Sequence, residues 1–507
     1  MTKKSLFLIS SFIAGFSLMV VELTSTRILA VYVGASIYTW TSVIGIILLG
    51  LAIGSYLGGR LIDRYYSSKT LFIFFILSSF FVAFIPILSN QSSLFVSLDL
   101  PLITTVILIS LILFLLPAIF IGTLYPSLLK FYLENIAVVG KKSGILSMFW
   151  SIGSIVGTFL TGFLFLGYFG SSTTIFIISI IFFINGLFFY RPKIKTLIIL
   201  FVLLAAVFYL FQIVRQKDND VFRKESNYYT IRIVDTIHDI FGRIRILFLD
   251  FDSHSVEGLD GQDLDAYPRI YPVFSVLNSN IKNILNLGGG SYSIAKKFVD
   301  FYKDSQVTVV EIDPMVNETA EKFFNLKSYP IKTDISDGRV FLVRNNEKYD
   351  LIFSDVYNSF VSVPWHLTTN EFNNLAKSHL NEEGIYAVNF LSALQGENSA
   401  FFRSMLSTFK KTFDNYQIFS FGSSIFDSQN IILVGINSSN QINPLDLKEK
   451  IKSLKDGDFL SSKLVLKKPS ENNALILTDD FAPVEKLMIP LINNYFPSYT
   501  EFYYSFL

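Results

Sequence analysis

Residues 283–290 read NILNLGGG, and VTVVEID follows at 307–313. The first stretch is a short apolar run that ends in three glycines, and the second ends its apolar run at Glu311, 21 residues after Gly290. Glycines at the first strand-to-helix turn let the backbone approach a ligand. A carboxylate about 20 residues later can accept hydrogen bonds from the ribose hydroxyls of a nucleotide. This pair predicts a Rossmann-like fold with a nucleotide-type site.

Four apolar runs in the second half of the chain alternate with stretches of helical periodicity. The runs are NILNLGGG, VTVVEID, YDLIFSD (349–355) and GIYAVNFL (384–391). Helices are expected at about 291–302, 314–325 and 369–380. This alternation predicts a parallel sheet covered on both faces. Before it, YTIRIVD (229–235) and GRIRILFLD (242–250) alternate apolar and polar residues, which predicts a small antiparallel β unit.

Asp355 ends the run YDLIFSD, and ligands of such sheets bind at the carboxyl ends of the strands. Its carboxylate is therefore expected at the centre of the ligand site. Taken alone, a strand-terminal aspartate is more often a helix cap or a turn residue. The glycines continue as GGGSYS, without a later phosphate-binding glycine. Because an S-adenosyl compound has no pyrophosphate to bind, this pattern favours such a ligand over a dinucleotide.

From Ser5 to Leu210 the chain carries few charges, and 51% of all residues are apolar. A membrane-spanning helix needs about 20 mostly apolar residues. Seven such stretches are expected, at about 6–30, 38–60, 70–89, 102–128, 143–167, 173–190 and 196–214. The chain is thus predicted to join three parts: a multi-pass helical membrane bundle (1–214), a linker with the small β unit (215–282), and a Rossmann-like transferase domain (283–507).

Glycines and charges inside these spans leave alternatives open. The glycines at every fourth position are Gly50, Gly54, Gly58, Gly153 and Gly157. Such stripes are typical of close helix packing, with a transport path as the alternative. Glu22 and Arg27 lie in the first span, where charge is costly and often functional. The alternatives for this pair are a position at a helix end or mutual neutralisation inside the bundle.

The distribution of basic residues predicts the orientation in the cell membrane. Lysine and arginine gather at 3–4, 60–69, 130–142 and 191–195, and the loops near 31–37, 90–100 and 168–172 contain none. The positive-inside rule then places the N-terminus in the cytoplasm. Seven spans put the soluble half outside, although an enzyme that uses an intracellular metabolite should face inward. Either one span is miscounted, or the enzyme works on the exoplasmic side, or the soluble half is not a working enzyme.

Composition argues against several other classes of function. The net charge is +1, which gives no electrostatic case for binding nucleic acid. The chain has no cysteine, so a disulfide framework and a thiol nucleophile are excluded. Its four histidines are His238, His254, His366 and His379. They show no metal-ligand spacing, and no metal is expected.

At these residues the sequence resembles the spermidine synthase family, the polyamine aminopropyltransferases, and more closely its membrane-fused branch. The family's motifs follow in order over 225–395, as ESNYY (225–229), LFLD (247–250), LGGG, VVEID, DGRVFL (337–342) and YDLIFSD. The stretches typical of the membrane-fused branch are PWHLTTNEF (364–372), LTDDFAPVE (477–485) and, in the first two spans, VELTSTRILA and LLGLAIGSYLGGRLIDR.

The resemblance implies roles for individual residues. The residues implied to bind the adenosyl co-substrate are Gly288, Gly289, Gly290, Glu311, Asp337 and Gly338. Of these, Glu311 would hold the ribose, and Asp337 with Gly338 would contact the adenine edge. Asp355 would be the catalytic carboxylate that accepts a proton from the attacking amine. The residues implied to bind the acceptor are Tyr229, Asp263, Tyr267, Asn358 and His366. His366 would be a proton carrier or a hydrogen-bonding loop residue.

The sequence also departs from the family pattern. The glutamine of the first motif is Tyr229, the acid of GGGDG is Ser291, and the second acid of DxxD is Asn358. The histidine and glutamate after the substrate-side tyrosine are Pro268 and Arg269. Several carboxylates that would hold a cationic amine are thus replaced. A serine at 291 would not repel the carboxylate of S-adenosylmethionine, which an acid there would do.

Three functions follow from these motifs. The first is a membrane-bound transferase that moves an aminopropyl group from decarboxylated S-adenosylmethionine to a polyamine acceptor such as putrescine. The second is methyl or aminopropyl transfer from S-adenosylmethionine, or its decarboxylated form, to another acceptor. The third is a non-catalytic ligand-sensing or transport-associated membrane protein. The expected partners are a small-molecule amine and the lipid bilayer, without nucleic acid or metal, and a homo-oligomer is left open.

Overall fold

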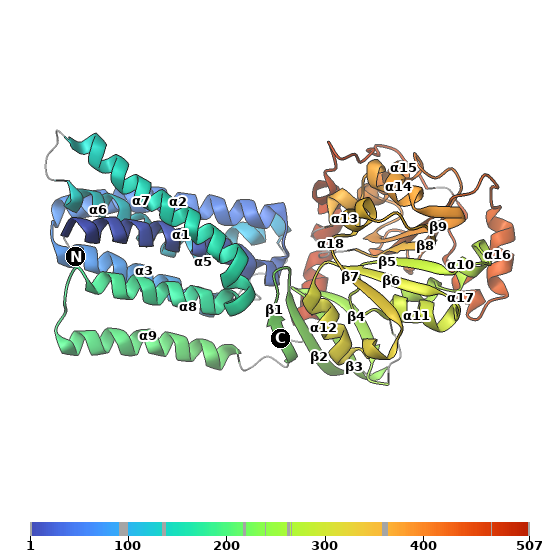
Figure 1. Cartoon of the computed structure of the whole chain (residues 1–507), viewed down its shortest axis with the longest axis horizontal. Coiled ribbons are helices and arrows are strands. Elements are labelled where there is room, and N and C mark those ends of the chain that lie inside the picture. The colour runs from blue at the N-terminus through green and yellow to red at the C-terminus, as the bar shows by residue number, and fades with distance from the viewer. Residues whose placement is uncertain are drawn as a thin grey trace. The chain divides into compact units, whose positions relative to one another are not determined.

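The computed structural model describes residues 3–90, 100–133, 138–215, 220–238, 240–260, 264, 266–356, 363–467 and 469–504 (Figure 1). By its internal contacts the chain divides into two compact units. The first comprises Met1–Asn219, Lys224–Thr230 and Pro497–Leu507, and the second comprises Asp220–Arg223 and Ile231–Phe496. Most of the small β unit therefore groups with the Rossmann-like sheet. The expected boundaries at 214/215 and 282/283 stay predictions.

The first unit is a bundle of apolar helices. Its helices are α1 (Lys3–Val33), α2 (Ile37–Arg64), α3 (Ser68–Ser89), α5 (Leu102–Gly122), α6 (Leu124–Tyr132), α7 (Val139–Leu160), a π-helical turn (Thr161–Phe165), α8 (Leu166–Leu187) and α9 (Ile194–Arg215). Among the described residues, six helical segments are long and apolar enough to cross a membrane: Lys4–Val33, Ile37–Arg64, Ser68–Ser89, Leu102–Tyr132, Val139–Leu187 and Ile194–Ile213.

The count of six differs from the seven expected because the stretches 143–167 and 173–190 form one segment, Val139–Leu187. This segment has 49 residues, which at 1.5 Å per residue is roughly 70 Å, more than twice the hydrocarbon thickness of a bilayer. It is broken at Gly170, where φ is 72° and ψ is 171°. Figure 1 shows α7 and α8 running in opposite directions on the two sides of the break. The segment thus supplies two arms, each of about one span's length.

Both glycine stripes lie at helix–helix contacts. A Cβ atom on Gly54 of α2 would lie 2.0 Å from the carbonyl oxygen of Ile119 on α5. A Cβ atom on Gly153 of α7 would lie 2.0 Å from the carbonyl oxygen of Phe12 on α1. Glycine lets two helix backbones approach this closely, whereas any side chain would separate them. The stripes therefore pack helices, as the first interpretation predicted.

Arg27 on α1 binds the segment 224–230, which belongs to the same unit. Its Nη1 donates to the carbonyl oxygens of Tyr228 (2.7 Å) and Asn227 (3.2 Å). Its Nη2 donates to the carbonyl oxygen of Ser226 (2.7 Å). The guanidinium of Arg27, near the C-terminal end of α1, is thus satisfied by backbone acceptors.

A second contact holds the same segment at the break in the long helical segment. Glu225 accepts hydrogen bonds from the backbone N–H of Ser171 (2.8 Å) and from its hydroxyl (2.6 Å). Ser171 directly follows Gly170, whose left-handed φ exposes that N–H to the carboxylate. The motif ESNYY is therefore held within the helical unit at both of its ends.

The small antiparallel sheet has the strand order β1-β2-β3-β4. Its strands are β1 (Asp220–Glu225), β2 (Thr230–His238), β3 (Gly242–Leu249) and β4 (Asp252–Gly258). Strands β2 and β3 are the two that the alternating pattern predicted. The outer strands β1 and β4 were not predicted, because DVFRKE and DSHSVEG are mostly polar.

The large sheet has seven strands in the order β10-β11-β9-β8-β5-β6-β7. Its strands are β5 (Asn283–Leu287), β6 (Gln306–Glu311), β7 (Ile331–Ile335), β8 (Tyr349–Ser354), β9 (Leu380–Ser392), β10 (Tyr416–Ser420) and β11 (Gln429–Ile436). The five strands from β9 to β7 are parallel, and β11 and β10 add to β9 in antiparallel fashion. Because β5 lies between β6 and β8, the strand order reverses there, at the point where such sheets bind ligands.

Helices cover both faces of this sheet, with α14 and α15 on one side and α10 and α11 on the other (Figure 1). The helices are α10 (Val273–Leu277), α11 (Ser293–Phe301), α12 (Pro314–Phe323), α13 (Gly338–Arg344), α14 (Asn370–Ser378), α15 (Ala400–Phe409), α16 (Pro444–Lys452), α17 (Gly457–Lys463) and α18 (Val484–Tyr504). Phe274, Phe298 and Phe353 pack edge to face in the core under α10 and α11. The three expected helices are α11, α12 and α14.

Candidate active site

Three strand ends meet at one edge of the large sheet. The N–H of Asp355 donates to the carbonyl of Leu287 (2.9 Å), and the N–H of Gly288 donates to the carbonyl of Val310 (2.9 Å). A Cβ atom on Gly288 would lie 2.2 Å from the carbonyl oxygen of Asp355, and φ of Gly288 is 91°. Glycine is therefore required at 288 by both space and backbone conformation. We call Gly288–Gly290, Glu311 and Asp355 the strand-tip cluster.

Glu311 links the glycine turn to the following loop. Its Oε2 accepts from the N–H of Gly289 (2.8 Å), and its Oε1 accepts from the N–H of Asp313 (2.9 Å). The side chain is buried, and burial raises the pKa of Glu311, although these backbone donors oppose the rise. Gly290 leaves open space, because a Cβ atom there would meet nothing within 4 Å. The predicted glycines and the predicted acid are thus brought together.

Asp355 is held by two neutral donors. The hydroxyl of Tyr267 donates to its Oδ2 (2.7 Å), and the Nδ2 of Asn389 donates to its Oδ1 (2.8 Å). Burial raises the pKa of Asp355, and the hydrogen bonds from Asn389 and Tyr267 oppose the rise. A carboxylate with a raised pKa and a fixed orientation is suited to accept a proton. The predicted acceptor residue Tyr267, at the start of a short 3₁₀ turn (Tyr267–Ile270), therefore lies beside the predicted catalytic acid.

Asn389 on β9 was missed by the sequence analysis. It is a single polar residue within the apolar strand IYAVNFL, and its side chain is 4% exposed. Its Oδ1 is buried and has no hydrogen-bond partner among the described residues. Buried polar atoms without partners are uncommon and often belong to functional sites. A lone amide in a fully buried strand was the signal that could have identified it.

Asp337 begins α13 and uses both carboxylate oxygens. Its Oδ1 accepts from the N–H groups of Arg339 (2.9 Å) and Val340 (3.0 Å), a helix N-cap. Its Oδ2 lies 3.0 Å from the Nε2 of His366. The hydrogen bond from His366 and these backbone donors hold the pKa of Asp337 below its ordinary value. Gly338 packs against Leu287, the last residue of β5. His366 therefore contacts the predicted adenine-side residue.

The two stretches typical of the membrane-fused branch are joined to each other through Arg339. The guanidinium of Arg339 forms an ion pair with Asp479 and donates to the carbonyl of His366 (3.0 Å). Thr369 also donates to Asp479 (2.8 Å). Arg339 lowers the pKa of Asp479 and occupies its carboxylate. Asp479 is thus committed to an internal ion pair.

Two departures from the family pattern are explained by local contacts. Ser291 is buried and its hydroxyl donates to the hydroxyl of Ser255 on β4 (2.7 Å). Arg269 forms an ion pair with Asp456 (2.9 Å) and stacks on Phe459, 4.0 Å from its ring centre. The guanidinium of Arg269 is therefore bound to residues at the start of α17.

Some predicted site residues are not placed with the strand-tip cluster. Tyr229 belongs to the helical unit. Asp263 and Asn358 lie outside the described residues. Within the described part of the chain, no three His, Asp or Glu residues group as candidate metal ligands. The expectation of no metal stays a prediction.

Residues 270–443, which include the whole strand-tip cluster, match the family of the spermine/spermidine synthase domain. The chain is 25% identical over 231 residues to a probable polyamine aminopropyl transferase of Bifidobacterium longum, a match that covers 43% of this chain and 51% of the relative. It is 32% identical over 149 residues to a polyamine aminopropyltransferase of Vibrio vulnificus, with 28% and 50% covered.

The chain thus spans about half the length of these curated relatives. Among solved structures, the spermidine synthase of Thermotoga maritima aligns with a TM-score of 0.39 and 17% identity, over 49% of this chain and 85% of that one. The matched residues include the predicted catalytic Asp355 and its hydrogen-bond partner Asn389, and Tyr267 lies three residues before the first matched residue.

Proposed function

We propose that this chain is a membrane-anchored aminopropyltransferase. Its donor would be decarboxylated S-adenosylmethionine, and its acceptor a small-molecule amine. The names of the relatives suggest a polyamine acceptor, and we take putrescine as the reference acceptor. The observation that carries the proposal is the position of Asp355, which two neutral donors orient at a strand tip beside a glycine turn.

The proposed donor site uses lone pairs that the protein leaves free. A carboxylate has about four acceptor positions. Glu311 accepts from the backbone N–H groups of Gly289, Gly290 and Asp313, which leaves one position for a ribose hydroxyl. Asp337 has three partners, the N–H groups of Arg339 and Val340 and the ring of His366, which leaves a position on Oδ2 for the exocyclic amine of adenine. The open side of Gly290 supplies room beside the turn.

The proposed reaction is a displacement at the carbon beside the sulfonium. The acceptor nitrogen must be neutral to attack, yet an alkylamine is mostly protonated at pH 7 because its pKa is near about 10.4. Its lone pair forms the new N–C bond, and the electrons of the broken C–S bond move to sulfur, which leaves as the thioether methylthioadenosine. Asp355 would accept the proton that the nitrogen loses and would attract the acceptor's charge.

Ser291 favours a second candidate, methyl transfer from S-adenosylmethionine. Its hydroxyl is buried and engaged by Ser255, so this position bears no charge that would repel the donor's carboxylate. Donor preference separates the two candidates, because only aminopropyl transfer releases methylthioadenosine. Methyl transfer releases S-adenosylhomocysteine instead.

The test is a product assay with the full-length protein in detergent. Each sulfonium donor is incubated with putrescine, and the released thioethers are separated by chromatography. We expect methylthioadenosine from the decarboxylated donor, and an Asp355→Asn variant should lose about 100- to 10,000-fold in rate. Asp446→Asn, an exposed aspartate on α16, is the matched control and should keep the rate. Unchanged turnover by Asp355→Asn would remove Asp355 from its role, and S-adenosylhomocysteine as the main product would favour methyl transfer.

A further inference from the structure

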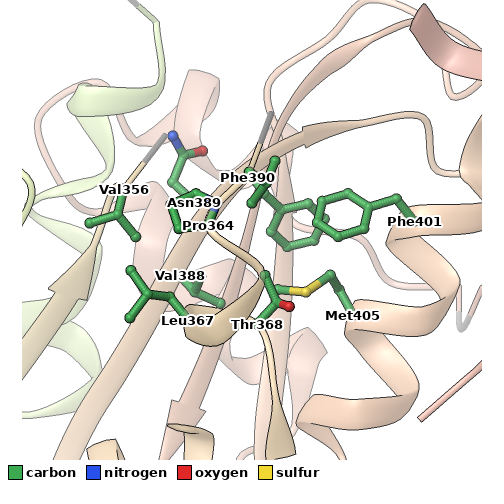
Figure 2. A pocket seen from close by; sticks show the side chains of 10 residues that line it. Val356, Pro364, Leu367, Thr368, Val388, Asn389, Phe390, Phe401 and Met405 are labelled. Atoms are coloured by element: carbon green, nitrogen blue, oxygen red, sulfur yellow. The ribbon is translucent and has the colours of Figure 1, made fainter. Parts of the chain in front are cut away.

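The apolar pocket beside Asn389 has little free space (Figure 2). Val356, Leu367 and Met405 are among the residues that line it, and about 10 Å³ within it is free. That volume is room for about one water molecule. The pocket is therefore too small for an additional ligand, and unpaired charges in the helical unit indicate a further binding site instead.

The end of α2, the short helix α6 and the start of α7 meet at one end of the helical unit. Lys130 on α6 forms an ion pair with Asp63 on α2, with 2.8 Å between Nζ and Oδ1. The ammonium of Lys142 on α7 lies 4.3 Å from the ring centre of Tyr132, the last residue of α6. Figure 1 shows α6 and the start of α7 at the end of the unit that holds the N-terminus.

Four basic side chains of these elements are left for a ligand. Arg60 and Arg64 belong to the last two turns of α2, and Lys141 and Lys142 belong to the first turn of α7. None of the four forms an ion pair within the described part of the chain. Arg60, Arg64 and Lys141 are exposed, and Lys142 is half-buried. We call these four residues, together with Lys130, the basic end, and such a group of cations attracts an anion.

The acids in the same stretches of sequence do not cancel this charge. Residues 60–69 and 130–142 together contain six basic residues and two acids, which are Asp63 and Glu134. Asp63 already binds Lys130, and Glu134 lies outside the described residues. With both acids counted, these stretches keep an excess of four positive charges.

Two tyrosines indicate that this end lies at the level of lipid head groups. The side chains of Tyr65 and Tyr66, directly after α2, are 53% and 58% exposed. Tyr66 also stacks on Phe131 of α6, with 4.5 Å between the ring centres. Tyrosine is enriched at the membrane–water interface because its ring is apolar and its hydroxyl is polar. The basic end therefore combines unpaired cations with aromatic residues typical of that interface.

The apolar residues before the two arginines offer a surface for acyl chains. Leu57 and Leu61 each precede an arginine of α2 by three residues, which places them on the same helix face, and both side chains are 37% exposed. The positive-inside rule places this end in the cytoplasm, and the cytoplasmic leaflet carries anionic lipids. A lipid whose chains lie against these leucines would bring its phosphate to Arg60 and Arg64.

We propose that the basic end binds the head group of an anionic phospholipid. The phosphate would accept hydrogen bonds from the guanidinium groups of Arg60 and Arg64 and from the ammonium of Lys141. A free phosphate ion shares this chemistry and lacks only the acyl chains. The inference assumes that the helical unit spans a membrane, as the proposed function does, and it does not depend on the transfer reaction.

The test titrates the full-length protein in detergent with dioctanoyl phosphatidylglycerol and, separately, with dioctanoyl phosphatidylcholine. Bound lipid is counted by native mass spectrometry. We expect phosphatidylglycerol to bind about tenfold more tightly or better, and excess inorganic phosphate to leave it bound. Equal affinity for the two lipids, or displacement by phosphate, overturns the proposal. Because no turnover is measured, a protein without transferase activity still tests this inference.

A variant that removes three charges locates the site. Arg60→Gln, Lys141→Gln and Lys142→Gln are combined, and this triple variant should bind phosphatidylglycerol roughly 100-fold more weakly, because each basic residue near the head groups contributes about fivefold. The matched control removes three exposed lysines outside the helical unit, Lys411→Gln, Lys455→Gln and Lys467→Gln. The control should keep the wild-type affinity. An equal change in both triple variants, or no change in the first, contradicts the proposal.

Circular dichroism shows whether the first triple variant keeps its helices. If it does not fold, Lys141→Gln alone takes its place and should bind phosphatidylglycerol about fivefold more weakly. Arg60→Lys, which keeps the charge, should bind this lipid with an affinity closer to that of the wild type. Unchanged affinity in a folded Lys141→Gln protein would show that the phosphate lies elsewhere.

Discussion

Asp355 has a buried carboxylate that accepts hydrogen bonds from two fixed donors. Burial and the two donors have opposite effects on the pKa of this carboxylate. Burial raises the pKa, whereas Asn389 and Tyr267 stabilise the ionised form and lower it. The net effect is a raised pKa. Since the proposed proton acceptor must be ionised, transfer should be lost as pH falls through this raised pKa. The acid limb of the pH–rate profile should therefore lie above that of an ordinary aspartate.

Replacing Tyr267 by phenylalanine tests this balance. The variant removes the hydroxyl that donates to Asp355 Oδ2 (2.7 Å) and leaves Asn389 in place. Loss of one donor to a charged group should move the acid limb of kcat/KM to higher pH by roughly one pH unit. At pH values well above the acid limb, where Asp355 is ionised in both proteins, kcat/KM should change less than it does on the limb. The measurement is the pH dependence of methylthioadenosine release, and a limb at unchanged or lower pH would show that Tyr267 does not set the ionisation of Asp355.

At the scale of elements, the glycine turn and the strands around it could be predicted because their signals are local. β5, β6 and β8 are short apolar runs that end in glycine or acid, and the helices after them have clear periodicity. The antiparallel direction of β10 and β11 could not be predicted. QNIILVGI is as apolar as a buried parallel strand, and hydrophobic pattern does not encode strand direction.

Contacts between residues that lie far apart in the sequence could not be predicted from local sequence patterns either. Tyr267 and Asp355 are 88 residues apart, and only the family resemblance suggested that they share a site. Asp337 and His366 were assigned to opposite ends of the ligand site, yet they are in contact. The spans predicted at 143–167 and 173–190 form one helical segment with a break at Gly170. The sequence did not predict this, because one glycine in an apolar stretch does not distinguish a loop from a kink.

The contact of α1 with the ESNYY motif yields a prediction at the same scale. The N–H groups of Tyr228 and Tyr229 donate to the hydroxyl of Ser226, and Arg27 fixes this turn through three carbonyls. Hydrogen bonds from a charged group contribute about 1.5–3 kcal/mol each. Arg27→Gln should therefore speed hydrogen–deuterium exchange at residues 228 and 229 at least tenfold.

The control for this experiment is Arg191→Gln, which removes an exposed arginine of the same unit. Exchange over 226–229 should stay at the wild-type rate in that variant. Equal exchange in both variants would mean that Arg27 does not order the turn, and that the geometry of the three carbonyl contacts carries little stability.

For the whole molecule, the same contacts bear on membrane orientation. Segment 224–230 is held by Arg27, near the C-terminal end of α1, and by Ser171, which directly follows the helix break at Gly170 in a stretch (168–172) without lysine or arginine. The positive-inside rule assigns that side to the exoplasm. We therefore predict that a reporter fused after Leu507 is active when its activity requires the exoplasmic side, such as alkaline phosphatase in a bacterial host.

A cytoplasmic fluorescent reporter at the same position is the matched control and should stay dark. The opposite result would mean that the two arms of Val139–Leu187 do not both cross the membrane. An exoplasmic synthase domain would not contribute to polyamine synthesis inside the cell. It would act on amines that reach the outer side, and the proposed transfer would require the donor to be present there.

The most direct single measurement is a calorimetric titration of methylthioadenosine into the full-length protein, its Glu311→Gln variant and its Glu318→Gln variant. Glu311 joins the glycine turn of the strand-tip cluster, whereas Glu318 is an exposed glutamate on α12. Loss of charged acceptors for the ribose should weaken binding by roughly 10- to 100-fold in Glu311→Gln. We predict saturable binding to the wild type and to Glu318→Gln with similar affinity. Equal affinity of all three proteins, or no binding to the wild type, would contradict an adenosyl site at these strand ends.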